Sequence, residues 1–159
     1  MTSNPRDDDT RFSPAVRDAL AAAGWSPGRR VPDDQLREWA GRLDGFTMSE
    51  AAERVLREFG GLSVDGHGPG LEVAREPFDI DPLVAIGEGE HFRHLTDEYG
   101  VELFPLGEAA QHFYFLAIDP QGRTYLAMED VSLLGATFDE ALEALVLGRL
   151  ATPVPKQPS

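Results

Sequence analysis

Two histidines and two aspartates are the side chains in this sequence whose spacing best suits chemistry. His91 and His94 stand three residues apart, and on a helix that spacing places two imidazoles on one face, where they could bind a transition metal. The sequence fixes no third ligand and contains no His-Glu-x-x-His pattern. We therefore interpret the pair as surface residues of a short helix and predict no metal site.

Asp79 and Asp81 alternate with the apolar residues Phe78 and Ile80. Two carboxylates at this spacing could hold a divalent cation. A period of two, however, places both on the solvated face of an extended segment, with the apolar residues on the other face. We interpret them as solvent-facing carboxylates.

Neither a phosphate-binding loop nor a catalytic nucleophile is indicated. Gly66, Gly68 and Gly70 have the composition of a phosphate cradle, but the residues after them alternate like a strand, whereas such loops open a helix whose amides bind the anion. The chain has no cysteine, and none of its serines has a suggestively placed histidine. The sequence predicts no catalytic residues and no cofactor, and an enzyme using the aspartates or histidines is the least favoured hypothesis.

The charge balance is strongly acidic. Asp and Glu number 28 against 14 Lys and Arg, a formal net charge of -14 over 159 residues. Such a chain repels nucleic-acid phosphates and favours a basic partner, although from the charge alone we prefer the interpretation that it serves solubility. With no cysteine, no signal-like N-terminus and no apolar run near the roughly 20 residues of a membrane span, the sequence predicts a soluble cytoplasmic protein without membrane or nucleic-acid contacts.

Helical periodicity dominates both ends of the folded part. We predict helices from Ser13 to Gly24, from Asp33 to Gly45 and from Thr47 to Phe59, with Trp25 and Trp39 in the core. In the third helix, Thr47 and Glu50 have the form of a capping box and Gly60 stands where a left-handed cap is expected. A last helix follows Thr137 and ends at Gly148.

Between these helices the period changes to two. We predict a hairpin of residues 62–64 with residues 71–73, an extended segment around 78–81, a short helix over 92–99 closed by Gly100, and extended residues 101–106 in which Pro105 suggests an edge or a strand end. A strand over 112–118 should return through the turn 119–122 into residues 123–128.

This order of elements predicts an α+β fold. One domain, residues 12–150, should pack N-terminal helices on a largely antiparallel sheet, with a closing C-terminal helix. The acidic N-terminus, residues 1–11, and the proline-rich tail, residues 151–159, are expected to be disordered.

Several segments of the chain resemble the SUKH superfamily, and in particular its third branch of bacterial immunity proteins. They are Ala23-Gly24-Trp25 with Gly28-Arg29-Arg30-Val31, the helix and Gly-Gly exit of residues 52–62, the run 74–82, and residues 103–108, 115–119, 122–125 and 138–142. The motif positions are Trp25, Phe59, Gly60, Gly61, Pro105 and Gly122.

The resemblance implies an α+β domain that binds and neutralises a toxin of a polymorphic toxin system, often a nuclease, without catalysis. The alternative, from the superfamily's fungal cell-wall regulators, is a regulatory protein-interaction module. We expect a basic cognate toxin as partner and a chain that is a monomer or weak dimer.

The binding face is predicted from the charges. If helices cover one side of the sheet, its other side is left free, and acidic residues near the Gly66 to Gly70 loop would lie on it or beside it. The candidates for partner binding are Glu72, Glu76, Asp79 and Asp81.

Overall fold

Three amphipathic helices precede the sheet, and each begins at a residue suited to that position. The computed structural model describes residues 11–158; the predicted disordered N-terminus, residues 1–11, lies outside them except for Arg11. Helix α2 spans Pro14–Ala22 and is capped by the Ser13 hydroxyl, which accepts from the Val16 amide. Helix α3 spans Asp33–Arg42. Helix α4 spans Glu50–Phe59 and buries one apolar face.

Helix α4 starts later than its sequence suggests. The Ser49 hydroxyl accepts from the Ala52 amide at 3.2 Å, so Ser49 is the N-cap and the predicted capping box at Thr47 is wrong. The later start places Glu50 and Glu53 in the first turn, where the positive end of the helix dipole favours carboxylates.

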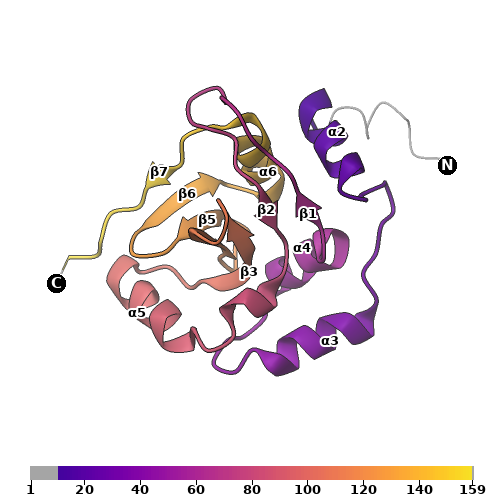
Figure 1. The fold of residues 1–159 in the computed structure, drawn as a ribbon. Coiled ribbons are helices and arrows are strands. Elements are labelled where there is room, and N and C mark those ends of the chain that lie inside the picture. Colours follow the sequence, from indigo (N-terminus) through magenta and orange to yellow (C-terminus); the bar gives the residue numbers. More distant parts are fainter. Residues whose placement is uncertain (1–10, 159) are drawn as a thin grey trace.

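The strands form one seven-stranded antiparallel sheet in the order of the sequence, β1 to β7 (Figure 1). They span Ser63–Val64 (β1), Phe78–Asp79 (β2), Phe104–Ala109 (β3), Tyr114–Ile118 (β4), Thr124–Ala127 (β5), Val131–Gly135 (β6) and Thr152–Pro153 (β7). Between β2 and β3 lie the 3-10 helix η1 (Pro82–Ala85) and α5 (Gly89–Tyr99), and α6 (Phe138–Leu147) follows β6. The α+β fold predicted from the sequence is confirmed.

The predicted hairpin of residues 62–64 with 71–73 is wrong. Strand β1 pairs with β2 instead, so that Val64 lies opposite Phe78. Residues 71–73 dock on the end of α6: the Leu71 amide donates to the Leu147 carbonyl, and the Val73 amide donates to the Gly148 carbonyl. A helix leaves its last carbonyls without partners, and this segment satisfies them.

Pro105 is the second residue of β3, so the strand-end alternative is correct, whereas the edge alternative is wrong because β3 lies inside the sheet. Strand β2 pairs only with Glu108 and Ala109 of β3, and the register of β3 with β4 shifts between Pro105 and Gly107. The proline therefore lies at an irregularity, on a part of β3 that does not pair with β2. A missing amide is tolerated at such a position.

Helices cover both faces of the sheet, and the expectation of a free face is not met. On one face Leu116, Ile118 and Leu106 join the core formed with α2, α4 and α6. On the other, Ala117 and Tyr125 pack against Phe92 and further residues of α5. Helix α5 is seen on the opposite side of the strands from α6 (Figure 1).

The proline-rich end of the chain adds the last strand. Composition predicts no regular structure after residue 150, whereas Thr152 and Pro153 pair with Leu133 and Ser132 of β6. Beyond β7 the Gln157 amide donates to the Glu98 carbonyl at 2.8 Å. A short strand that contains proline suits a sheet edge, because proline has no amide to offer a further strand.

Candidate functional site

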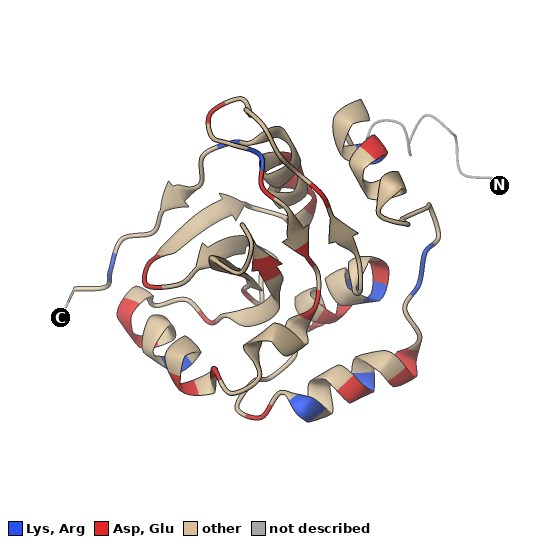
Figure 2. Ribbon diagram, in the orientation of Figure 1, with Lys and Arg blue, Asp and Glu red and all other residues tan. Residues whose placement is uncertain are grey.

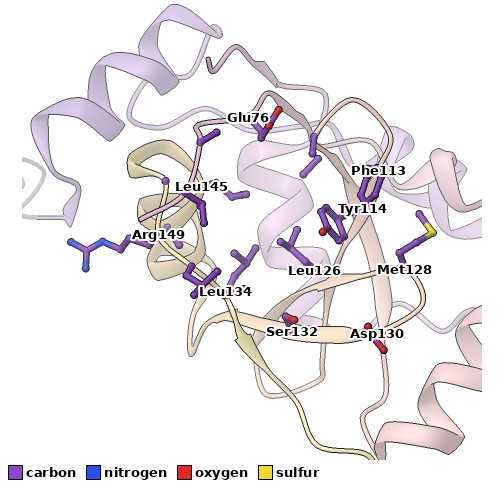
Figure 3. A pocket seen from close by; sticks show the side chains of 18 of the residues that line it. Glu76, Phe113, Tyr114, Leu126, Met128, Asp130, Ser132, Leu134, Leu145 and Arg149 are labelled. Atoms are coloured by element: carbon purple, nitrogen blue, oxygen red, sulfur yellow. The ribbon is translucent and has the colours of Figure 1, made fainter. Parts of the chain in front are cut away.

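A groove lies beside α6, on the α6 side of the sheet. It encloses about 900 Å³ between strands β4 to β6, the end of α6, residues 73–76 and the start of the tail. Leu126, Leu134 and Leu145 converge on its centre, with Ser132 beside them (Figure 3). All four are only partly buried by the rest of the chain. The groove therefore presents an apolar surface that the fold leaves open.

The rim of the groove is acidic. Glu76, Glu129 and Asp130 contribute carboxylates, and Arg149 is the single cation among the described lining residues. The guanidinium of Arg149 points away from the groove (Figure 3). This local excess of negative charge follows that of the whole chain, whose acidic residues are spread over most elements (Figure 2).

The loop between β3 and β4 projects Phe113 at one end of the groove. Its three residues before Phe113 all have left-handed backbone conformations, with φ of 57° at Ala110, 55° at Gln111 and 74° at His112. None is glycine, the residue that adopts this conformation without cost. This turn is also why β4 begins at Tyr114, two residues after the predicted strand start at His112.

Two hydrogen bonds and an ion pair hold the turn. The Ala110 amide donates to the Pro77 carbonyl at 2.9 Å, and the Phe113 amide donates to the Ala110 carbonyl at 3.2 Å. His112 Nδ1 contacts the Glu108 carboxylate. The hydrogen bond to Glu108 raises the pKa of His112, and the negative charge of the carboxylate adds to the shift.

The four acidic candidates from the sequence are not brought together. Glu76 lines the groove, and Glu72 accepts from the Leu150 amide at 3.0 Å beside it. Asp79 lies on β2 opposite Glu108, and Asp81 caps η1 by accepting from the Leu83 amide. Both aspartates are partly buried, and Asp81 is engaged in a cap. The interpretation of the pair as solvent-facing carboxylates is therefore only partly correct.

The two histidines have separate roles. His91 Nε2 lies 2.6 Å from the Met128 carbonyl, so that α5 is joined to the β5–β6 turn. His94 is exposed and lies 3.4 Å from Glu98. Nowhere in residues 11–158 do three or more His, Cys, Asp or Glu side chains gather as metal ligands, and no helix there could cross a membrane.

Asp119 is the most heavily engaged carboxylate of the sheet. Its side chain is 1% exposed and accepts from the Gln121 and Arg123 amides, from Arg123 Nε at 2.7 Å and from the Tyr125 hydroxyl at 2.8 Å. Burial raises the pKa of Tyr125 to about 12, and the bond to Asp119 adds to the shift. These hydrogen bonds to Asp119 close the predicted β4–β5 turn.

Residues of the first sequence motif, 23–31, bind the end of α4 where the chain leaves the helix at Gly60. Arg29 donates to the Glu58 carbonyl at 2.7 Å and to the Gly60 carbonyl at 2.9 Å, and Trp25 Nε1 donates to the Glu58 carboxylate at 3.0 Å. Trp25 also stacks on Phe59, with ring centroids 6.5 Å apart. The motif residues thus build the scaffold around the end of α4.

The predicted left-handed cap at Gly60 is wrong. Gly60 has an ordinary φ of -57°, and Gly61, with φ of 88°, is the residue in the left-handed region. Glycine is needed at position 60 for space, because a Cβ there would lie 2.7 Å from the Trp39 ring and 2.5 Å from the Leu56 carbonyl.

Sequence reasoning missed the groove, although one of its candidates, Glu76, lies on it. The lining residues come from segments between Val73 and Pro153. Leu126, Leu134 and Leu145 are partly buried and pack against the main core. A sign was available in Leu150, an apolar residue that follows the predicted end of the last helix at Gly148.

Comparison with known proteins gives one match. The family model of the SUKH-3 immunity protein matches residues 12–148, which confirms the resemblance seen in the sequence. No curated protein and no solved structure matches the chain.

Proposed function

The chain belongs to the SUKH-3 immunity protein family, and from that membership we propose that it neutralises one cognate toxin by binding it, without catalysing a reaction. Toxin immunity is the general role that the family indicates. The identity of the toxin and the way in which it is blocked are the parts that we propose.

The observation that supports binding is the open groove beside α6. Its floor of partly exposed leucines and its 900 Å³ volume offer a concave apolar surface of the kind that partners and ligands use. The carboxylates on its rim would add specificity of charge. Two other concave surfaces of the described residues are smaller, at about 390 Å³ and 250 Å³.

A basic toxin suits this chain best. A nuclease must bind phosphates and so carries a cationic cleft, to which a protein of net charge -14 is attracted. Among the acidic residues considered from the sequence, Glu76 is placed to act on the groove itself. Glu72, Asp79 and Asp81 would contribute to long-range attraction rather than to direct contact.

Action by binding alone is supported by how the polar side chains are used. Asp81, His91 and Asp119 each hold part of the fold through hydrogen bonds. We propose that the protein acts as a monomer or weak dimer in the cytoplasm of the toxin-producing bacterium, as part of a polymorphic toxin system.

The test starts from the native host. The tagged chain is used to capture proteins from host extract, the captured toxin is identified and purified, and its killing of a susceptible strain is measured with and without co-expression of this chain. We expect a tight complex that abolishes killing. A captured partner without toxic activity would favour a regulatory interaction module, and turnover of a toxin or its product by the chain would show an enzyme.

A further inference from the structure

Exposed apolar side chains are concentrated at the groove. The described residues include five large apolar residues that are strongly exposed: Leu71 at 66%, Val73 at 39%, Ile86 at 47%, Phe113 at 63% and Leu150 at 66%. Val73, Phe113 and Leu150 line the groove, and Leu71 lies two residues from Val73 on the segment that docks on α6. Only Ile86, next to η1, belongs to another surface. Single exposed apolar residues are ordinary, but a cluster around a groove marks an interaction site.

The backbone conformation that places Phe113 at the end of the groove is energetically unfavourable. Three successive residues without glycine in the left-handed region are costly, at about 1 kcal/mol or more for each. A glycine-containing turn would connect β3 and β4 at less cost. The ring of Phe113 rests on Tyr114 with centroids 5.0 Å apart and is otherwise directed to solvent. An exposed aromatic residue that a hydrogen-bonded turn holds at the edge of a groove has the properties of an interface anchor.

The negative charge of the groove rim favours a basic partner over a second copy of this chain. In a complex of two copies of this chain, each copy would carry a net charge of -14 and two acidic rims would face each other. The two copies would therefore repel each other. A segment with Lys or Arg would instead find Glu76 and Glu129, both exposed. The neighbouring cation Arg75 does not line the groove; its guanidinium lies toward Gly68.

We propose that the groove and Phe113 form the toxin-docking surface, and that the toxin segment bound there pairs an apolar side chain with flanking lysine or arginine. This inference rests on the proposed function. The apolar side chain fills the space between Leu126, Leu134 and Leu145, the basic residues meet Glu76 and Glu129, and Phe113 packs on an apolar patch of the toxin.

Part of this surface lies beyond the region that defines the family. The family match ends at residue 148, whereas Arg149, Leu150, Ala151 and Pro153 form one wall of the groove. The scaffold and the recognition surface therefore overlap only partly. Variation in the tail can change the wall without touching the core.

The experiment measures binding of the purified toxin that the wild-type chain neutralises. Phe113→Ala should raise the dissociation constant at least about 30-fold, as loss of an aromatic interface anchor does. Ile86→Ala, which removes an equally exposed apolar side chain elsewhere, should change it less than about twofold. Both variants should keep the circular dichroism spectrum and melting temperature of the wild type, because neither side chain is buried.

A second pair of variants tests the charges. Glu76→Lys with Glu129→Lys should slow association about tenfold or more at low salt, and the difference should shrink as salt rises. Asp18→Lys with Asp97→Lys makes the same change of net charge on exposed residues away from the groove and should slow association much less.

Two results would overturn the proposal while the proposed function stands. The first is neutralisation with unchanged affinity in Phe113→Ala and in the Glu76, Glu129 pair, which would place the interface elsewhere. The second is a wild-type dimer in light scattering that Phe113→Ala abolishes, which would make a second copy the occupant. A wild-type chain that neutralises no toxin would overturn both the function and this inference.

Discussion

The end of α4 and the groove beside α6 use their residues in opposite ways. At the end of α4, Trp25, Arg29 and Glu58 bind one another or the exit backbone, and Gly60 leaves only enough space for the Trp39 ring. At the groove, the side chains of Phe113 and Leu150 are mostly exposed to solvent, and a strained turn holds Phe113 in this position. A site kept for a partner holds apolar groups that the fold does not need, and the groove has this property whereas the end of α4 does not.

The turn at Asp119 resembles the end of α4, because its polar groups bind residues of the chain itself. Within residues 11–158 no buried side-chain nitrogen or oxygen lacks a hydrogen-bond partner, and Asp119 alone satisfies four donors. Substitutions in these two closed regions should lower stability, whereas substitutions in the groove should lower binding. The following predictions test that division, from the largest effect on stability to the smallest.

Asp119→Ala should destabilise the fold by about 3–4 kcal/mol. The change leaves the Tyr125 hydroxyl and two backbone amides without their acceptor, and hydrogen bonds to a charged group contribute about 1.5–3 kcal/mol each before the donors find water. Urea unfolding gives the number, with Asp97→Ala on the exposed face of α5 as control. A loss below about 1 kcal/mol would mean that this buried carboxylate is not a structural centre.

Gly60→Ala should cost about 2–3 kcal/mol, because the new methyl group overlaps the Trp39 ring and the Leu56 carbonyl. Gly61→Ala is the matched variant: its Cβ meets nothing closer than 3.7 Å, but its φ of 88° is strained for alanine, so a cost of about 1 kcal/mol is expected. Thermal melts of the two variants decide the order. The reverse order would restore the left-handed cap to position 60.

Tyr125 should make stability fall at alkaline pH. Its pKa is raised from 10.0 to about 12 in the folded protein, so the stability that its proton provides is complete below pH 10 and is lost as pH rises through 12. Over that window the loss should reach up to about 2 kcal/mol. Tyr125→Phe should be less stable than the wild type at pH 8, and the difference between them should narrow toward pH 12. A constant gap would contradict the assignment of this titration to Tyr125.

Phe113→Ala should change the free energy of unfolding by less than about 0.5 kcal/mol, which is typical of exposed positions. The control is Phe59→Ala at the end of α4, where the ring is 2% exposed and the loss should be about 3–5 kcal/mol. Were Phe113→Ala to unfold the protein as readily, Phe113 would belong to the core, and the contrast between the two regions would fail.

Local patterns determined most of the helices and one hairpin. The stripes in α2, α3, α4 and α6 and the left-handed caps at Gly100 and Gly148 follow from spacing and from single residues, since a helix is decided by neighbours within one or two turns. The turn at Asp119 and the antiparallel return into β5 were predicted in the same way. The family motif was readable for the same reason, because most of it lies in continuous segments.

Tertiary structure alone decided which segments pair and where the open surface lies. Residues 71–73 alternate like a strand, yet they bind the free carbonyls of α6, whose position no local pattern contains. Gly60 needs to be glycine because of Trp39, a residue of another helix. The groove joins residues as far apart as Val73 and Pro153, and only the folded chain shows that its leucines remain partly open while those of the core are closed. Burial depends on every element packed around a side chain, and for that reason a sequence pattern can indicate an apolar face but cannot say how much of it is left for a partner.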